Sequence, residues 1–209
     1  MLNFFKEVFK KGELRRKVVF TLGILFVFRL GAGIVIPYID TSAITSAATS
    51  SGIFGIMNML GGGTLEKFSL FSLGVSPYIT SSIIIELLSM DVIPALAQWN
   101  KEGNTGKKKK DKVTRVLTLA LAIIQGGSLT YAFDKGYSIL ASSSIWTYVY
   151  VVIVMAAGSM FTMWLGDQIT IKGVGNGTSL LIFTGIVANL PNSFISSFKS
   201  MVTFGSAYK

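Results

Sequence analysis

The run Ile145–Leu165 (IWTYVYVVIVMAAGSMFTMWL) contains no charged side chain and is long enough to cross a lipid bilayer as a helix. Such a crossing takes about 20 predominantly apolar residues, because the hydrocarbon layer is roughly 30 Å thick. Four more stretches are similarly apolar: Val18–Tyr38, Leu70–Met90, Val113–Phe133 and Thr178–Phe198. The sequence therefore predicts an all-α fold, a polytopic membrane helix bundle with five transmembrane helices.

The composition of the 209-residue chain supports a membrane protein and excludes several other classes. Hydrophobic side chains make up 51% and charged ones 14%, whereas soluble domains carry about a quarter charged residues. The chain has no Cys and no His, which excludes Ser-His and Cys-His nucleophiles, disulfide frameworks and ordinary zinc sites. We therefore expect no enzyme and no cofactor. A Ser-Lys or two-Asp intramembrane enzyme stays compatible with the composition, but no such pair is evident at a suitable depth.

The net charge of +9 is distributed unevenly over the segments that flank the predicted crossings. Fourteen Lys and Arg residues fall on the side of the N-terminus: six in residues 1–17, seven in residues 101–115, and Lys172. The four on the other side are Lys67, Lys135, Lys199 and Lys209, and Arg29 lies inside the first crossing. By the positive-inside rule the N-terminus and the loop with Lys107–Lys110 are cytoplasmic, in a multi-pass plasma-membrane protein. The basic residues are thus topology signals, and we expect no direct role in binding nucleic acid.

Residues 1–17 are expected to form a cytoplasmic segment separate from the membrane part, residues 18–209. Leu2, Phe5 and Phe9 share one helical face, which is typical of a short amphipathic helix at the lipid surface. A disordered basic tail is the alternative. The following apolar stretch is too long for a signal-peptide core and lacks a small-residue cleavage pattern, so we expect it to stay as an anchor.

The segment between the first two crossings is irregular. Gly52–Leu60 (GIFGIMNML) is apolar but too short to span, and three consecutive glycines follow it. Pro77 then suits the first turn of a new helix, because proline lacks a backbone N–H. We expect a broken helix, with a short re-entrant half on the outer side, a hinge, and a spanning half from Pro77 to Met90. Broken helices in membrane proteins usually line an aqueous path.

Three polar side chains lie inside the apolar spans. Glu86 either reaches interfacial water near the cytoplasmic end of its helix or has a pore-side or proton-handling role. Arg29 is expected to face other helices and to pair with a carboxylate or with helix-end carbonyls. Gln125 is expected to form hydrogen bonds between helices.

Between the last two crossings the sequence is rich in glycine over residues 173–177. A phosphate-binding loop is a weak match, because no buried strand precedes the glycines and no Gly-Lys-Ser/Thr triplet follows them. A tight cytoplasmic turn fits better. Asn176 and Gly177 suit a left-handed backbone conformation, and Thr178 or Ser179 can cap the next helix.

Two long stretches resemble the diagnostic segments of the SecY family, the channel subunits of bacterial protein translocases. They are SLFSLGVSPYITSSIIIELL (Ser69–Leu88) and WLGDQITIKGVGNGTSLLIF (Trp164–Phe183). The KEGNTGKKKK loop and the GIFGIMNMLGGG element are also similar to this family. The resemblance covers essentially the whole chain but only the N-terminal half of the family's ten-helix protein. It therefore implies the first five transmembrane helices, which form one half of an inverted-repeat channel.

The resemblance also implies roles for particular residues. A plug within residues 52–73 would close the resting channel from the outer side; its residues would be Met57, Asn58, Met59, Leu60, Gly61, Gly62, Gly63, Leu65, Phe68 and Phe71. A hydrophobic pore ring would consist of Ile79, Ile83, Ile182 and Ile186. Polar contacts at a lateral gate toward the lipid would be Ser82, Glu86 and Gln125. A ring of branched apolar side chains disfavours water and ions but selects nothing in a passing peptide. Without the resemblance, these isoleucines would indicate ordinary helix packing.

By the same resemblance the chain is a subunit of a channel that moves unfolded preproteins across the bacterial plasma membrane and inserts membrane segments into it. The implied partners are the C-terminal half of the channel, SecE and SecG-type subunits, the SecA motor or the ribosome, and signal sequences. A cytoplasmic partner or anionic lipid would contact Lys107, Lys108, Lys109, Lys110 and Lys172, although topology alone also explains these lysines.

The alternative function is half of an inverted-repeat secondary transporter. Such a protein would need ionisable residues that converge near the midplane of the membrane. At most Arg29 and Glu86 meet this requirement.

Overall fold

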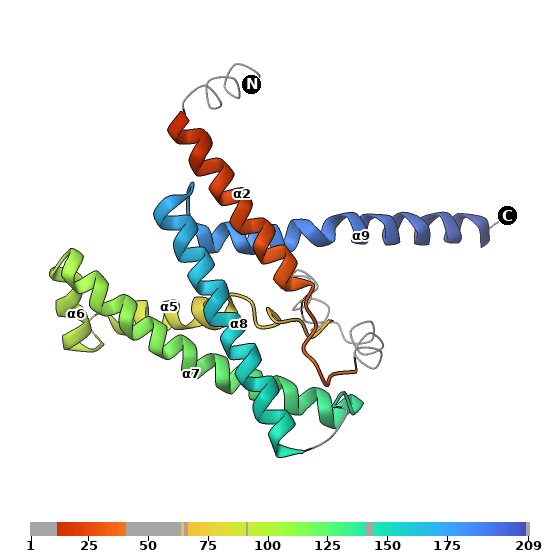
Figure 1. The fold of residues 1–209 in the computed structure, drawn as a ribbon, viewed down its shortest axis with the longest axis horizontal. Helices are drawn as coiled ribbons and strands as arrows, with labels where there is room; N and C mark the ends of the chain where they lie inside the picture. Colours follow the sequence, from red (N-terminus) through yellow and green to blue (C-terminus); the bar gives the residue numbers. More distant parts are fainter. Residues whose placement is uncertain (1–11, 41–63, 65–66, 91, 141–143, 208–209) are drawn as a thin grey trace.

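A computed structural model describes residues 12–40, 64, 67–90, 92–140 and 144–207 of the chain (Figure 1). In chain order the helices are α2 (Gly12–Ala32), α5 (Ser76–Leu88), α6 (Pro94–Lys101), α7 (Asn104–Tyr137), α8 (Ile145–Lys172) and α9 (Gly177–Ala207). Within the described residues, extended pairing is limited to two isolated bridges, from Val35 to Ser69 and from Ile39 to Leu140. This part of the chain therefore has the all-α fold that the sequence predicts.

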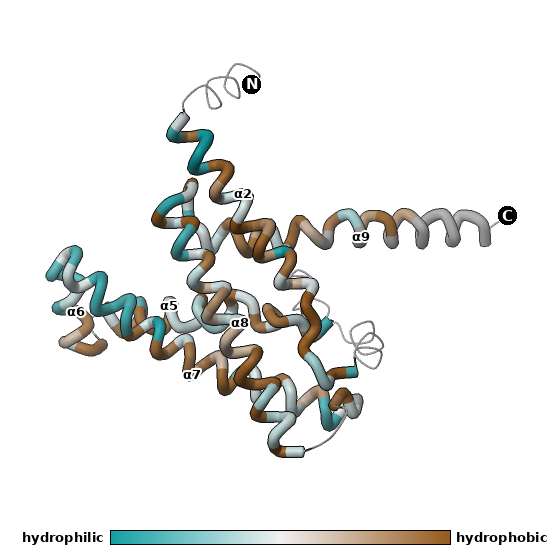
Figure 2. Tube along the Cα trace, viewed as in Figure 1, coloured by the Kyte–Doolittle hydropathy of each residue, from teal (hydrophilic) through white to brown (hydrophobic). Residues whose placement is uncertain are grey.

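Two of the described helices, α7 and α8, are long and apolar enough to cross a membrane. Figure 2 shows the contrast along α7, whose first turns are hydrophilic and whose later turns are apolar. Helix α5 and the first part of α9, Gly177–Ala188, are apolar but shorter. With 13 residues, α5 is about 20 Å long and cannot cross the hydrocarbon layer by itself. The count of five crossings stays a prediction.

Several helices begin or end outside the apolar stretches in the sequence. Helix α2 begins at Gly12, within residues 1–17. Helix α7 begins at Asn104, so Lys107–Lys110 lie in its first turns and the prediction of a loop there is wrong. Lys172, also expected in a loop, is the last residue of α8. A prediction from hydropathy places the end of each segment at the edge of the apolar run. The observed helices continue through lysine and arginine, because these residues are good helix formers.

Helix α2 ends earlier than its apolar stretch, and the residues that follow pair with a distant part of the chain. The Ile36 N–H donates to the Phe68 carbonyl (3.1 Å), and the Leu70 N–H donates to the Ile34 carbonyl (2.8 Å). These bonds satisfy backbone groups that a helix would otherwise have satisfied internally. They also fix residues 68–70 beside the end of α2.

Two clusters of buried apolar side chains hold the helices together. The first surrounds Phe68, whose ring packs edge-on against Phe133 with 5.4 Å between the centroids. The second surrounds Phe71, which stacks on Phe28 at 5.5 Å. Helix α8 contributes to both clusters and packs against α2, α7 and α9 (Figure 1). The short segment from Phe68 to Phe71 is thus anchored in both parts of the core.

Hydroxyl groups inside the helices donate to carbonyls of their own helix. Thr118 bonds to the Thr114 carbonyl (2.7 Å), Thr130 to the Gly126 carbonyl (2.7 Å), and Thr162 to the Gly158 carbonyl (2.8 Å). Each bond spans four residues, the pattern by which Ser and Thr are accommodated inside helices. A hydroxyl satisfied in this way does not need water, which suits a helix in lipid.

Candidate functional site

A cavity of about 700 Å³ lies between α2, α5, α7 and α9. Its wall is mostly apolar, with Phe28 from α2, Ile79 from α5, Ile124 and Leu129 from α7, and Leu181 and Ile182 from α9. The turns before α5 complete it through residues 72–75. Four segments that are distant in the sequence therefore line one apolar space, which is partly open.

Two of the four isoleucines assigned to a pore ring line this cavity. Ile79 and Ile182 belong to its wall. Ile83 and Ile186 are not among the lining residues, and 54% of the Ile83 surface is exposed. Ile83 lies one helical turn after Ile79, and Ile186 lies one helical turn after Ile182, beyond the wall that the described residues form. The structure thus brings together one isoleucine from α5 and one from α9.

The polar groups of the cavity wall are few, and most are already engaged. The Thr80 hydroxyl donates to the Ser76 carbonyl (3.1 Å), and the Ser128 hydroxyl donates to the Ile124 carbonyl (2.7 Å). Gln125 also lines the cavity, and within the described part of the chain its amide forms no hydrogen bond. The helix-to-helix hydrogen bond predicted for Gln125 is therefore not formed between these residues. Its amide, like the Ser76 hydroxyl of the same wall, is therefore able to bond to a guest.

The three residues assigned to a lateral gate do not form one cluster. Gln125 lies in the cavity, whereas Ser82 and Glu86 are not among its lining residues. The Glu86 carboxylate pairs with the ammonium of Lys110 on α7, with 2.5 Å between Oε2 and Nζ. Glu86 is thus tied to the beginning of α7.

Only part of the predicted plug lies within the described residues. Met57, Asn58, Met59, Leu60, Gly61, Gly62, Gly63 and Leu65 lie outside them. Phe68 and Phe71 are described, and both are almost completely buried. Their rings belong to the two core clusters, and residues 67–75 form turns. In this structure Phe68 and Phe71 therefore anchor the chain in the core.

Backbone contacts with α8 set the start of α5. Gly74 has a positive φ of 53°, which few residues other than glycine adopt, and its carbonyl accepts a hydrogen bond from the Ser159 hydroxyl (3.1 Å). Gly158, the neighbour of Ser159, lies directly against the Leu70 carbonyl. Pro77 follows in the first turn of the helix, as predicted. These contacts orient Ile79 toward the cavity.

The turn between α8 and α9 is tight, as predicted, but its residues have different roles from those expected. The left-handed residue is Gly175, with φ of 75°. Asn176 caps α9, because its Oδ1 accepts a hydrogen bond from the Ser179 N–H (3.2 Å). The Val174 N–H donates to the Thr21 hydroxyl (3.1 Å), which joins this turn to α2. Sequence spacing gave no indication of that contact.

Polar contacts bring the basic segments together at one end of the bundle. Thr21 places the middle of α2, one turn after Lys17, beside the α8–α9 turn. Arg115 near the start of α7 pairs with Asp167 near the end of α8, with 2.7 Å between the charged atoms. The residues expected to contact a cytoplasmic partner or lipid lie at this end, but they differ: Lys107, Lys108 and Lys172 are exposed, Lys109 pairs with Glu102 (2.8 Å), and Lys110 pairs with Glu86.

The chemistry of the cavity is that of a surface for contact with apolar or weakly polar chains. Its wall carries isoleucine, leucine and phenylalanine side chains, with one free amide from Gln125. Within the described ranges, no three acidic, His or Cys side chains group in a way that could hold a metal ion.

Comparison with known proteins identifies relatives of this chain. The family model described as SecY matches residues 69–208. Protein translocase subunit SecY 1 of Lactobacillus kefiranofaciens subsp. kefiranofaciens is 43% identical over 209 residues, which cover 99% of this chain and 48% of that protein. Protein translocase subunit SecY of Bacillus subtilis (strain 168) is 41% identical over 195 residues, 92% of this chain and 45% of that protein. The chain thus spans about half the length of the curated relatives it matches.

Solved structures agree at the level of the fold. A structure described as that of a protein conducting channel matches with a TM-score of 0.57 and 18% identity, over 82% of this chain and 36% of that one. Sec61 in the canine ribosome-channel complex from the endoplasmic reticulum matches with the same values. The curated relatives are named as protein translocase subunits, and they do not favour the transporter alternative.

Proposed function

The chain belongs to the SecY family, and we propose that it builds half of a protein-conducting channel in the bacterial plasma membrane. Unfolded preproteins pass through this channel, and signal or transmembrane segments leave it sideways into the lipid. The observation that carries the proposal is the 43% identity to a translocase subunit along the whole chain. The channel provides a path and catalyses no reaction, so a partner supplies the energy.

The cavity is the half of the pore that this chain contributes. Ile79 and Ile182 form its apolar constriction together with Ile83 and Ile186, and the C-terminal half of the channel supplies the opposite wall. Ile83 is 54% exposed in this chain, and in the proposed channel the other half covers it. The chain by itself is therefore expected not to translocate preproteins.

The outer side of the pore is closed by a plug formed within residues 52–73. The buried rings of Phe68 and Phe71 support its attachment to the core at this end. Ser82, Glu86 and Gln125 lie along the lateral gate, where the free Gln125 amide is able to bond to a segment that moves into the lipid.

The basic end of the bundle faces the cytoplasm, where the N-terminus also lies. The contact of α2 with the α8–α9 turn and the Arg115–Asp167 pair between α7 and α8 support this orientation, because both lie near the Lys and Arg residues of these helices. The exposed Lys107, Lys108 and Lys172 face the SecA motor, the ribosome or anionic lipid headgroups. SecE and SecG-type subunits complete the assembly.

Ile79→Asn and Ile182→Asn test the proposed pore in the complete channel, reconstituted into liposomes. A polar amide in an apolar constriction stabilises water and ions there. We expect resting ion leakage to rise about tenfold, the change that about 1.4 kcal/mol makes in the equilibrium between closed and open states. Transport of a preprotein by the unsubstituted channel is measured in the same liposomes.

Ile195→Asn is the matched control, because Ile195 lies on α9, is 54% exposed and is not among the residues that line the cavity. Its leakage is expected to equal that of the unsubstituted channel. The pore assignment is wrong if all three variants leak and transport alike.

A further inference from the structure

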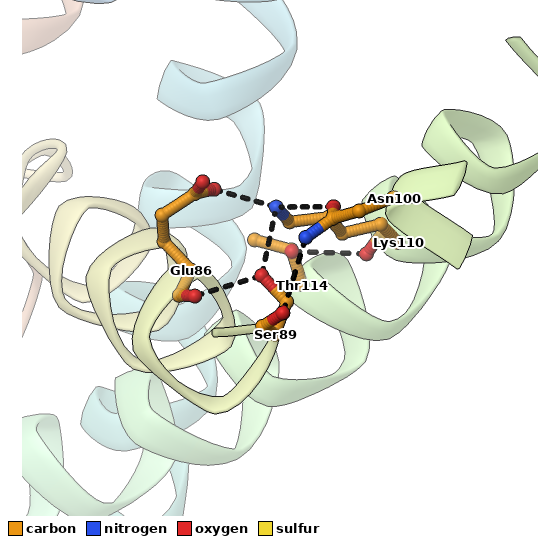
Figure 3. Close-up of polar contacts among 5 residues, drawn as sticks. All are labelled: Glu86, Ser89, Asn100, Lys110 and Thr114. Carbon is orange, nitrogen blue, oxygen red and sulfur yellow. Dashed lines mark hydrogen bonds and ion pairs between the residues drawn. The ribbon is translucent and has the colours of Figure 1, made fainter. Parts of the chain in front are cut away.

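Lys110 lies where α5, α6 and α7 meet. Figure 3 shows its ammonium between Glu86 of α5 and Asn100 of α6. The Nζ atom lies 2.5 Å from the Glu86 carboxylate, 3.3 Å from the Ser89 hydroxyl and 3.4 Å from the Asn100 amide oxygen. Only 18% of the Lys110 side chain is exposed, compared with 58% for Glu86. Lys110 is therefore an interior contact of three helices, unlike its exposed neighbours in the basic run.

The partners of Lys110 surround the C-terminal end of α5. A helix ends in unpaired carbonyls and a partial negative charge, which a nearby cation stabilises. The last turn of α5 contains no basic residue of its own. Ser89, which ends this helix, donates its hydroxyl to the Glu86 carbonyl (2.7 Å), and Asn100 donates to the Ser89 carbonyl (3.1 Å). Lys110 thus supplies from α7 the cation that α5 lacks.

The position of α5 depends strongly on α7. Helix α5 has 13 residues, packs mainly against α7, and has only a small contact with α8. Its N-terminal end is held by the core around Phe71 and by Gly74, whereas its C-terminal end is held by the contacts of Lys110 and Asn100. Ile79 lies between these two attachments and lines the cavity. Release of the C-terminal attachment would therefore let α5 tilt and would move Ile79.

We propose that Lys110 is a positioning residue, which holds the cytoplasmic end of α5 against α7 through Glu86 and so keeps the pore constriction closed in the resting channel. This inference rests on the proposed function, because it assigns Ile79 to the constriction. It separates Lys110 from the other lysines of the run: its charge acts inside the protein, and those of Lys107 and Lys108 act on what lies outside.

Lys110→Met and Glu86→Gln test the proposal in the complete channel, with nitroxide labels at Leu87→Cys on α5 and Val116→Cys on α7. This chain has no native cysteine, so labelling of its half is specific. We expect the label-to-label distance distribution to broaden in both variants. Resting ion leakage is expected to rise about tenfold, as for the loss of one hydrogen-bonded charge contact. The double variant Glu86→Gln, Lys110→Met should change no more than Lys110→Met alone, since the contact that Glu86→Gln removes is one of those that Lys110→Met also removes.

Lys112→Met is the matched control, because Lys112 is an exposed lysine of α7 without an ion pair to the described residues. Its distance distribution and leakage should equal those of the unsubstituted channel. The proposal would be overturned if the distance distributions of Lys110→Met and Glu86→Gln matched that of Lys112→Met. Additive effects in the double variant would also overturn it. The label-to-label distances are measured without preprotein transport, so they test the role of Lys110 independently of the proposed function. If the unsubstituted channel moved no preprotein, that result would contradict the proposed function and not the role of Lys110.

Discussion

Gly158 is a position where the close approach of two backbones depends on the absence of a side chain. A Cβ atom built at this residue would lie 1.8 Å from the Leu70 carbonyl oxygen, far inside any allowed contact. The segment around Leu70 would therefore have to move away from α8. We expect Gly158→Ala to lower the free energy of unfolding by about 1–3 kcal/mol, the usual cost of overpacking in a core. Thermal unfolding in detergent measures this loss.

Gly23→Ala is the comparison for Gly158→Ala. Gly23 also lies inside a helix, but nothing is within 4 Å of a Cβ atom placed there. Alanine is the better helix former, so this variant should be as stable as the original protein or more stable by up to about 1 kcal/mol. Equal unfolding temperatures for both variants would show that the contact between α8 and Leu70 is not as tight as the structure has it.

Single residues near the site also show what sequence patterns cannot separate. Ile79 and Ile83 are equally apolar and lie four residues apart, yet only Ile79 lines the cavity. Lys109 and Lys110 are adjacent lysines, but they pair with carboxylates on different segments. In each case the difference depends on the direction of the side chain relative to other helices, which hydropathy and charge do not encode.

At the scale of elements, the contact between α2 and the α8–α9 turn depends on one hydroxyl. Thr21 donates to the Lys17 carbonyl (2.9 Å) and accepts from the Val174 N–H (3.1 Å). In Thr21→Val the side chain keeps its shape but leaves this N–H without its partner. We expect the free energy of unfolding to fall by about 0.5–1.5 kcal/mol, the net contribution of a typical hydrogen bond, because Val174 is partly exposed and water can reach its N–H. A detergent unfolding titration measures the change.

Thr21→Ser retains the hydroxyl and should keep most of the stability. Because the contact joins α2 to the turn, Thr21→Val should also increase hydrogen exchange of the Val174 amide, and Thr21→Ser should not. If the valine and serine variants were equally stable and equally protected, the hydroxyl would not be what attaches α2 to this turn.

The helix boundaries were predicted well where the apolar stretch and the helix begin at the same residue. Helix α8 begins at Ile145, the first residue of its apolar stretch, and no basic residues extend it backward. Helix α7 begins nine residues before Val113, since lysine-rich sequence is hydrophilic but still helical. Helix α6 was not predicted, because its eight residues are too short and too mixed to show an apolar period.

For the whole molecule, the proposed orientation makes opposite predictions for the two ends of α7. Thr105 lies in the first turn of this helix and Ser138 directly follows its end, and both are exposed. In intact cells with the outer membrane absent or permeabilised, Ser138→Cys should react with a membrane-impermeant maleimide and Thr105→Cys should not. The bilayer between the two positions is the physical reason, since the reagent cannot cross it.

Lysis of the same cells should make Thr105→Cys reactive as well, which controls for burial of the thiol. Labelling of Thr105→Cys from outside, with Ser138→Cys protected until lysis, would reverse the orientation of the bundle and contradict the assignment of its basic end to the cytoplasm.

The sequence by itself determined the class of fold and the family, and it predicted which segments share the basic end of the molecule. Hydropathy, charge and motif order depend only on residues that are close together in the chain, so they can be read without knowledge of how the helices pack. Only the tertiary structure decided which side chains meet. The Glu86–Lys110 and Arg115–Asp167 pairs are separated by 24 and 52 residues, and Ile79 and Ile182 belong to different helices. Such meetings follow from how helices cross and pack, which no spacing rule within one segment specifies.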